Sequence, residues 1–335
     1  MSDPDPTTGP TTDPTPFELV TMGRVGVDLY PLQVGVPLED VTSFGKYLGG
    51  SSTNVAVAAS RLGHRAATIT RTGEDPFGRF VHRALRGFGV DDRWVTAVDH
   101  LPTPVVFCEI FPPDDFPLYF YRFPTAPDLE IHADELDLDA IAAAEVFWTT
   151  VTGLSRQPSR DAHLTALAAR STRPAGGRVA ATVLDLDYRP MFWDTEAEAT
   201  AAIARALPHA TVAVGNREEC RVAVGESEPR AAAAALHAAG VDLAVVKQGP
   251  DGVLGSRRHP DGRVEQVVVP PVPVDVVNGL GAGDAFGGAL VHGLLTGLGL
   301  RDTLTLANGA GSYVAGQLSC ADAMPTLTEL TEYLS

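Results

Sequence analysis

The sequence predicts an α/β fold: a doubly wound, mostly parallel sheet flanked by helices, with a small second β-sheet. Segments of strand and helix character alternate along most of the 335 residues, which is typical of repeated βαβ units. Residues 31–46 and 100–124 have strand character without an intervening helix. We therefore expect these two segments to form a small sheet that stands off the main one.

The first half of the chain begins this alternation. Its predicted elements are a strand over 17–31 that ends near Asp28, a helix over 49–63, a strand over 67–73, a helix over 77–90 and a hairpin over 103–124. The first helix follows Ser and Thr residues and ends at Gly63, a residue type common at helix ends. The hairpin is predicted because Pro-Pro-Asp-Asp joins two β-rich runs.

The second half of the chain continues the alternation of strands and helices. Strands are predicted over 144–151, 178–190, 211–219, 243–252 and 264–274, and helices over 160–173, 284–297 and 304–317. Polar residues and glycines follow several of these strands. Ligands bind at the carboxyl ends of parallel strands, so we expect a site there.

Composition narrows the function. The net charge of −17 and the pI near 4.8 argue against binding to nucleic acid or to anionic membranes. A few local Arg or Lys residues can still attract an anionic substrate. No uninterrupted apolar run could span a bilayer, and Cys108, Cys220 and Cys320 look like reduced thiols. We expect a cytoplasmic protein with a disordered tail over 1–16, rich in Pro, Thr and Asp, and a single domain over 17–335.

The segment Asn278-Gly-Leu-Gly-Ala-Gly-Asp284 is the most informative motif. Small residues before a helix let unpaired backbone N–H groups approach a phosphate closely. An acidic residue at that position can deprotonate a hydroxyl that attacks the phosphate. The alternative is that Asp284 only caps the helix, and this segment alone leaves both interpretations open.

Five further groups follow predicted strands or begin helices. They are Asp28; Gly49, Gly50 and Asn54; Asn216 and Glu219; Lys247, Gly249 and Gly252; and Arg189. Each has a simpler explanation as a turn, a cap or a surface ion pair. Together with the Asp284 segment they favour a site that binds a polyol and nucleotide phosphates.

In combination, these residues resemble the ribokinase-like carbohydrate kinases, the phosphofructokinase-B family, from Phe17 to Leu334. The motifs that carry the resemblance are Gly49-Gly-Ser-Ser-Thr-Asn-Val-Ala56 and Gly281-Ala282-Gly283-Asp284 at opposite ends of the chain. The resemblance implies a nine-stranded core, a β-sheet lid over the sugar, ATP with Mg²⁺, and often dimers formed through the lids. It implies that Asp284 is the catalytic base, that Gly281, Ala282 and Gly283 stabilise the transferred phosphoryl group, and that Glu219 holds the metal through water. Asn216, Lys247, Gly249, Gly252 and Asn308 would bind the nucleotide.

Segments such as residues 107–122 (FCEIFPPDDFPLYFYR) resemble the members that phosphorylate a keto sugar acid of inositol catabolism. The resemblance implies transfer to the C6 hydroxyl, with Asp28, Gly49, Gly50 and Asn54 holding hydroxyls and Arg189 and Arg122 holding the carboxylate. A different acceptor (2-dehydro-3-deoxygluconate, fructose or a nucleoside) and a non-catalytic sugar-binding regulator remain alternatives.

Three positions depart from the family pattern. Asn278 stands where many relatives have Asp, and Gly279 where they have Thr or Ser. This region helps to form a monovalent-cation site in relatives, so a K⁺ requirement is doubtful. Asp187 replaces a frequent Asn and adds a negative charge near the expected sugar-acid site.

Overall fold

The computed structural model describes residues 16–171 and 180–335. The predicted disordered tail, residues 1–16, lies outside this range except for Pro16. The last residues of the helix predicted over 160–173 and the first of the strand predicted over 178–190 also lie outside it.

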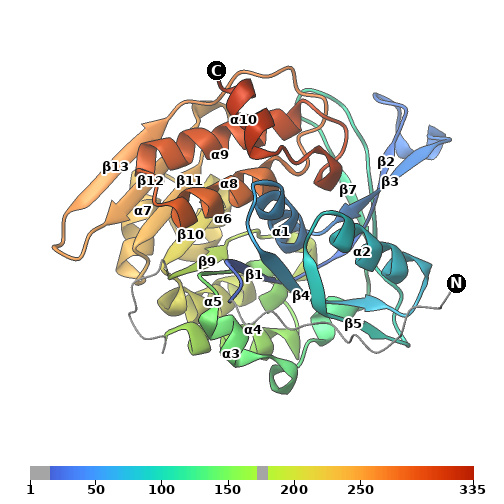
Figure 1. The fold of residues 1–335 in the computed structure, drawn as a ribbon, viewed down its shortest axis with the longest axis horizontal. Coiled ribbons are helices and arrows are strands. Elements are labelled where there is room, and N and C mark those ends of the chain that lie inside the picture. Colours follow the sequence, from blue (N-terminus) through green and yellow to red (C-terminus); the bar gives the residue numbers. More distant parts are fainter. Residues whose placement is uncertain (1–15, 172–179) are drawn as a thin grey trace, which may run out of the picture.

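A nine-stranded sheet forms the centre of the molecule (Figure 1). Its strands, in spatial order, are β13 (Val264–Val269), β12 (Val253–Arg258), β11 (Leu243–Lys247), β10 (Val212–Asn216), β9 (Ala181–Asp185), β8 (Val146–Thr150), β1 (Leu19–Met22), β4 (Ala66–Gly73) and β5 (Asp91–Val98). All neighbouring pairs are parallel except those of β12, which is antiparallel to both β11 and β13. The predicted mostly parallel sheet is confirmed.

The order of the strands reverses at β1. From β1 the chain proceeds to β4 and β5 at one edge, and it then returns to β8 on the other side of β1 and continues outward. Such a reversal leaves a crevice at the carboxyl ends of the two central strands. The candidate site lies there.

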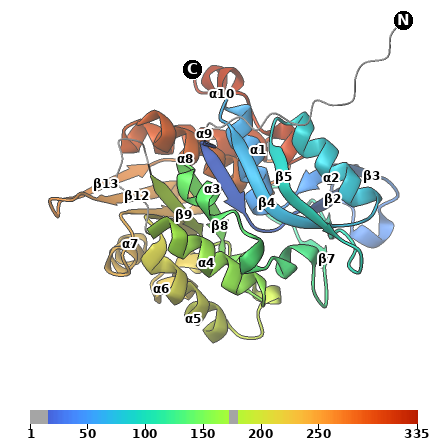
Figure 2. The same ribbon diagram turned by 60° about the horizontal axis from the view of Figure 1, so that its bottom comes forward.

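Helices cover both faces of the sheet (Figure 2). One face carries α1 (Ser51–Arg61), α2 (Pro76–Gly87), α8 (Ala282–Thr296), α9 (Leu300–Ala315) and α10 (Leu327–Tyr333); the other carries α3 (Leu138–Ala143), α4 (Ser159–Ser171), α5 (Glu196–Ala206), α6 (Arg217–Val224) and α7 (Pro229–Ala238). The central strands are buried on both faces, with Trp148 of β8 packing on the first side and Phe147 on the second. This arrangement explains why these strands read as continuous apolar runs.

Helices α1 and α8 lie unusually close together. A Cβ atom added at Gly288 would lie 2.3 Å from the Cβ of Ala58, and one added at Gly287 would lie 2.8 Å from the Trp148 ring and 3.0 Å from Val55. Only glycine permits this approach. It brings the N-termini of two helices from opposite ends of the sequence to the same crevice.

Four strands form the second sheet, in the order β3 (Phe44–Gly49), β2 (Gly26–Pro31), β6 (Val105–Cys108) and β7 (Leu118–Tyr121). The small separate sheet is therefore confirmed, and β6 and β7 form the predicted antiparallel hairpin. Of the segment predicted over 31–46, only the end of β2 and the start of β3 are strands. We refer to these four strands as the lid sheet.

The prediction of a single strand over 17–31 is wrong. It divides into β1 of the main sheet and β2 of the lid sheet, and Asp28 lies within β2 and not at the end of a main-sheet strand. The chain leaves the main sheet at Gly23, whose φ of +154° and lack of a side chain permit a close approach to Ser52. Strand composition continues across this break, so hydrophobic pattern alone does not reveal it.

Within residues 16–171 and 180–335, no helix combines the length and the apolar character that crossing a bilayer requires.

Candidate active site

A cleft of about 260 Å³ lies between the lid sheet and the first turns of α1 and α8. It is lined by Arg24, Asp28, Tyr30, Gly50, Ser51, Asn54, Val106, Leu118, Phe120, Arg189, Gly279, Leu280, Gly281, Gly283, Asp284 and Cys320. Both sequence motifs that carry the family resemblance contribute to this one cleft.

Gly281 begins α8. Its φ of +81° lies in the left-handed region that favours glycine, and an added Cβ atom would lie 2.6 Å from Cys320 Sγ. The N–H groups of Ala282 and Gly283 stand at the open end of the helix, where no carbonyl of the same helix can accept from them. The helix thus presents backbone donors and a partial positive charge to the cleft.

Asp284 does not cap this helix. It is the third residue of α8, and its two carboxylate oxygens accept hydrogen bonds from Asn54 Nδ2 at 2.8 Å and from Ser51 Oγ at 3.1 Å. Burial raises the pKa of Asp284, and the hydrogen bonds from Asn54 and Ser51 oppose that rise. A buried carboxylate held by donors from another helix is suited to accept a proton at a fixed position.

Asp28 enters the cleft from the middle of β2. Its Oδ2 accepts a hydrogen bond of 2.7 Å from the Tyr30 hydroxyl, which also lies 2.7 Å from Cys320 Sγ. A Cβ atom added at Gly49 would lie 2.1 Å from Asp28 Oδ1. Gly49 is therefore glycine because Asp28 occupies the adjacent space.

Burial raises the pKa of Asp28 from 3.8 to about 6, against the lowering effect of the Tyr30 hydrogen bond and Arg24. The folded protein binds this proton more tightly than the unfolded chain, so stability is lost as the pH rises through this interval. We expect Asp28→Asn to increase the free energy of unfolding by about 3 kcal/mol near pH 8 and by little below pH 4. Urea denaturation of both proteins across this range measures the difference. If the difference in unfolding free energy between the two proteins did not change with pH, the raised pKa of Asp28 would be contradicted.

Two arginines flank Asp187. Arg189 Nη2 lies 2.8 Å from Asp187 Oδ1, and Arg24 Nη2 lies 3.7 Å from Asp187 Oδ2. Burial opposes the ionisation of Asp187, but Arg189 and Arg24 outweigh it and lower its pKa. The negative charge that departs from the family pattern is thus neutralised by two cations.

Arg122, the second predicted carboxylate ligand, does not line the cleft. Its Nη2 lies 2.8 Å from Asp128 Oδ2, and both side chains are almost fully buried. The guanidinium also lies 4.9 Å from the Phe192 ring centroid. The structure places Arg122 in a buried ion pair beneath the lid sheet, so it is withdrawn from the substrate-binding set.

A second group of charges surrounds Lys247 at the end of β11. Burial disfavours its positive charge, but Glu219 and Asp185 outweigh this effect and raise the pKa of Lys247. A Cβ atom added at Gly283 would lie 3.6 Å from Lys247 Nζ, so this cation faces the start of α8. A cation, two carboxylates and open helix donors together suit a nucleotide phosphate with a divalent metal.

Asn216 and Glu219 form a reciprocal cap at the start of α6. Asn216 Oδ1 accepts from the Glu219 N–H at 2.8 Å, and Glu219 Oε2 accepts from the Asn216 N–H at 2.7 Å. This cap fixes the Glu219 side chain, which is buried, and leaves its Oε1 as the atom that could face a metal-bound water.

The other predicted nucleotide residues have structural partners. Gly249 and Gly252 form the turn between β11 and β12, where the Gly252 N–H donates to the Gly249 carbonyl at 3.0 Å. Asn308 Nδ2 donates to the Pro270 carbonyl at 2.9 Å, which ties α9 to the segment after β13. Asn278 donates to the Leu318 carbonyl at 2.8 Å and accepts from the Leu280 N–H at 3.0 Å, so it shapes the loop before α8.

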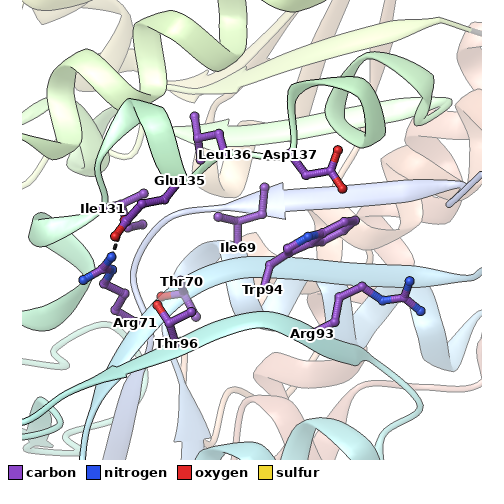
Figure 3. A pocket seen from close by; sticks show the side chains of 10 residues that line it. All are labelled: Ile69, Thr70, Arg71, Arg93, Trp94, Thr96, Ile131, Glu135, Leu136 and Asp137. Atoms are coloured by element: carbon purple, nitrogen blue, oxygen red, sulfur yellow. Dashed lines mark hydrogen bonds and ion pairs between the residues drawn. The ribbon is translucent and has the colours of Figure 1, made fainter. Parts of the chain in front are cut away.

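A second cavity, also of about 260 Å³, lies at the β4–β5 side of the sheet (Figure 3). Ile69, Trp94, Ile131 and Leu136 give it a mostly apolar lining, and an ion pair between Arg71 and Glu135 closes one side. It contains none of the residues predicted to bind sugar or nucleotide. The charged cleft beside Asp284 is therefore the candidate active site.

Sequence reasoning missed five polar residues of the site: Arg24, Tyr30, Ser51, Asp185 and Cys320. Ser51 and Tyr30 lie close to Gly50 and Asp28 in sequence, so proximity to those residues could have found them. Arg24, Asp185 and Cys320 stand in no motif that marks them. They reach the cleft only through the path of the folded chain.

Comparison with known proteins identifies the family. Residues 17–327 match the pfkB family of carbohydrate kinases. A 5-dehydro-2-deoxygluconokinase of Shouchella clausii is 31% identical over 317 residues, which cover 94% of each chain, and that of Clostridium tetani is 30% identical over 325 residues, 95% of this chain and 93% of that protein.

Solved structures share the fold. A putative ribokinase II of E. coli in complex with ATP and Mg²⁺ superposes with a TM-score of 0.84 at 22% identity, covering 95% of this chain and 99% of that one. A Vibrio cholerae fructokinase double mutant with fructose, ADP and potassium bound gives a TM-score of 0.81 at 25% identity, covering 96% and 99%. The chain belongs to the pfkB family of carbohydrate kinases.

Proposed function

We propose that the protein transfers the γ-phosphoryl group of ATP to the C6 hydroxyl of 5-dehydro-2-deoxy-D-gluconate, as a cytoplasmic step of inositol catabolism. The observation that carries the reaction is the buried Asp284 carboxylate, held by Asn54 and Ser51 beside the open end of α8. The acceptor is supported by the relatives of that name, which match over almost the whole chain.

The lid side of the cleft receives the sugar acid. Asp28 accepts hydrogen bonds from acceptor hydroxyls, and Gly50 allows the close approach of the chain that forms this wall. Arg189 provides a cation for the carboxylate, because a buried charge without a partner costs several kcal/mol. Asn54 contributes mainly by fixing Asp284, to which its amide already donates.

The opposite side receives the nucleotide. Lys247 and the N–H groups of Ala282 and Gly283 bind phosphate oxygens, and Asn216, Gly249, Gly252 and Asn308 belong to the segments that surround the rest of ATP. Glu219, with Asp185 beside it, suits Mg²⁺, which in such sites is held by one or two carboxylates, by water and by phosphates. When bound, Mg²⁺ supplies neutralisation of charge on the phosphates.

Asp284 accepts the proton of the C6 hydroxyl as that oxygen attacks the phosphorus atom. The Ala282 and Gly283 N–H groups stabilise the charge on the transferred group. Phe120, Leu118 and Val106 of the lid sheet cover the cleft and exclude water, which would otherwise compete with the sugar.

A coupled ADP-release assay with Mg-ATP tests the proposal. The acceptors are 5-dehydro-2-deoxygluconate, 2-dehydro-3-deoxygluconate, fructose, ribose and adenosine. We expect a clear preference for the first. Preference for another would retain the kinase and replace the acceptor, and binding without turnover on any of them would identify a sugar-binding regulator.

We further propose a homodimer formed through the lid sheets. Several large apolar side chains on or beside this sheet are exposed: Leu32 (53%), Val34 (47%), Tyr121 (65%) and Phe123 (58%). Such a patch is typical of protein contacts. Light scattering should therefore give about twice the chain mass of 35.2 kDa, and a monomer mass at micromolar concentration would contradict the dimer.

A further inference from the structure

Arg24 is the most completely enclosed cation of the cleft. It lies in the connection between β1 and β2, where the chain leaves the main sheet, and 12% of its side chain is exposed. Its carbonyl oxygen accepts hydrogen bonds from Ser52 Oγ at 3.3 Å and Thr53 Oγ1 at 3.2 Å. A Cβ atom added at Gly50 would lie 2.4 Å from the same carbonyl. The backbone of Arg24 is thus fixed against the start of α1.

The donors of this guanidinium are largely unmet. Its Nε is buried and has no hydrogen-bond partner in the part of the chain that the structure describes. Among residues 16–171 and 180–335 it forms one ion pair, with Asp187, whose length of 3.7 Å exceeds that of a normal hydrogen bond. Five N–H groups in a planar fork are suited to a carboxylate, and burial without an acceptor is costly.

The surroundings of Arg24 direct these donors to the sugar side of the cleft. Phe120 of the lid sheet lies with its ring centroid 5.7 Å from the guanidinium carbon. Burial raises the pKa of Asp28 and of Asp284, and the charge of Arg24 opposes this rise at both carboxylates. The pKa of Arg189, by contrast, is raised by the negative charges of Asp187, Glu219, Asp284 and Asp185. Both arginines line the cleft with Asp28 and Asp284, and Arg24 lies against Phe120 of the lid sheet, the wall that also carries Asp28.

An acidic acceptor needs such a cation. Asp28 and Asp284 both line the cleft, and an incoming carboxylate would be repelled by each of them. Asp187 orients Arg189 through one oxygen and attracts Arg24 through the other, so the two guanidinium groups share one anchor. Asp187 thus has one guanidinium group beside each of its carboxylate oxygens.

We propose that Arg24 determines the specificity for an acidic acceptor by binding its carboxylate, together with Arg189, in a clamp anchored on Asp187. The proposal rests on the proposed function, because it concerns how that kinase distinguishes a sugar acid from a neutral sugar. It also gives Asp187 a role: the residue holds two cations in place of adding a repulsive charge.

The test compares 5-dehydro-2-deoxygluconate with its C1 primary amide, a neutral isostere, as acceptors. The parent enzyme should prefer the acid in kcat/KM by about 10²-fold, the value expected of hydrogen bonds between charged partners. Arg24→Met should abolish most of this preference and leave the KM for ATP within about threefold, since the phosphate-binding groups lie on the other side. An undiminished preference in this variant would overturn the proposal.

Two further variants keep the result decisive if Arg24→Met folds poorly. Arg24→Lys keeps the charge but loses the fork, so it should retain a preference of about tenfold. Arg24→Ala should regain turnover of the acid on addition of guanidinium ion, and not of urea. Failure of both responses would assign Arg24 a structural role. If the parent enzyme phosphorylates only a neutral acceptor, the proposed acceptor fails and the role of Arg24 falls with it.

Discussion

Asp284→Asn should lower kcat by about 10²-fold or more while the affinity for Mg-ATP stays close to that of the parent protein. The amide keeps the size of the side chain, and its oxygen can still accept from Asn54 Nδ2, which now lies 2.8 Å from the carboxylate. What the variant loses is the ability to accept the proton of the attacking hydroxyl. Steady-state kinetics and the dissociation constant of an ATP analogue measure the two effects separately.

Asp302→Asn is the matched control. Asp302 is also the third residue of its helix, α9, but it is exposed and remote from the cleft, so it carries the same electrostatic relation to a helix N-terminus without the site. The kcat of this variant should equal that of the parent protein. Near-normal kcat in Asp284→Asn would remove the base assignment, and equal losses in both variants would attribute the effect to the helix terminus.

Arg122→Met should lower the free energy of unfolding by about 3 to 5 kcal/mol, because it leaves Asp128 as a buried charge without its partner. Folded domains are stabilised by only about 5 to 15 kcal/mol, so this loss would be severe. Urea denaturation measures it. Where the variant is folded, its preference for the acid over the neutral acceptor should be unchanged, since Arg122 does not line the cleft.

Asp128→Asn in the Arg122→Met background should recover part of this stability, because it removes the unpaired charge. Arg221→Met is the comparison on the surface. Arg221 pairs with Glu196 and Glu218 in exposed positions, where ion pairs contribute little to stability. The decrease in the free energy of unfolding should therefore be far smaller for Arg221→Met than for Arg122→Met. A stable Arg122→Met with a raised KM for the sugar acid would return Arg122 to the substrate site.

Much of the fold follows from the sequence. The alternation of apolar runs and helix patterns predicts the parallel sheet, since β8 and its neighbours are buried on both faces. Pro-Pro-Asp-Asp predicts the lid hairpin. The break at Gly23 was missed because strand composition continues from β1 into β2, and only the pairing partners differ between them.

The site was only partly predictable for a related reason. Glycines and acids at helix starts mark Asp284 and the Gly49-Gly50 pair in the sequence. Arg122 and Arg24 both precede or follow strands in the lid region, and nothing in their local sequence distinguishes them. Asp128, six residues after Arg122, forms an ion pair with Arg122. Arg24, in contrast, keeps unmet hydrogen-bond donors in the cleft. Only the tertiary partners decide which arginine is free to bind a ligand.

The close contact between α1 and α8 has a consequence for protein synthesis. Ser51 and Asn54 leave the ribosome more than 200 residues before Asp284, the acceptor of both their hydrogen bonds. A nascent chain that ends before residue 278 has neither Asp284 nor the helix that packs against Ala58. In such a chain the side chains of Ser51 and Asn54 lack their acceptor, and the part of the cleft that α8 forms is absent. Formation of the cleft therefore requires that synthesis has passed α8 and that this helix has docked on α1.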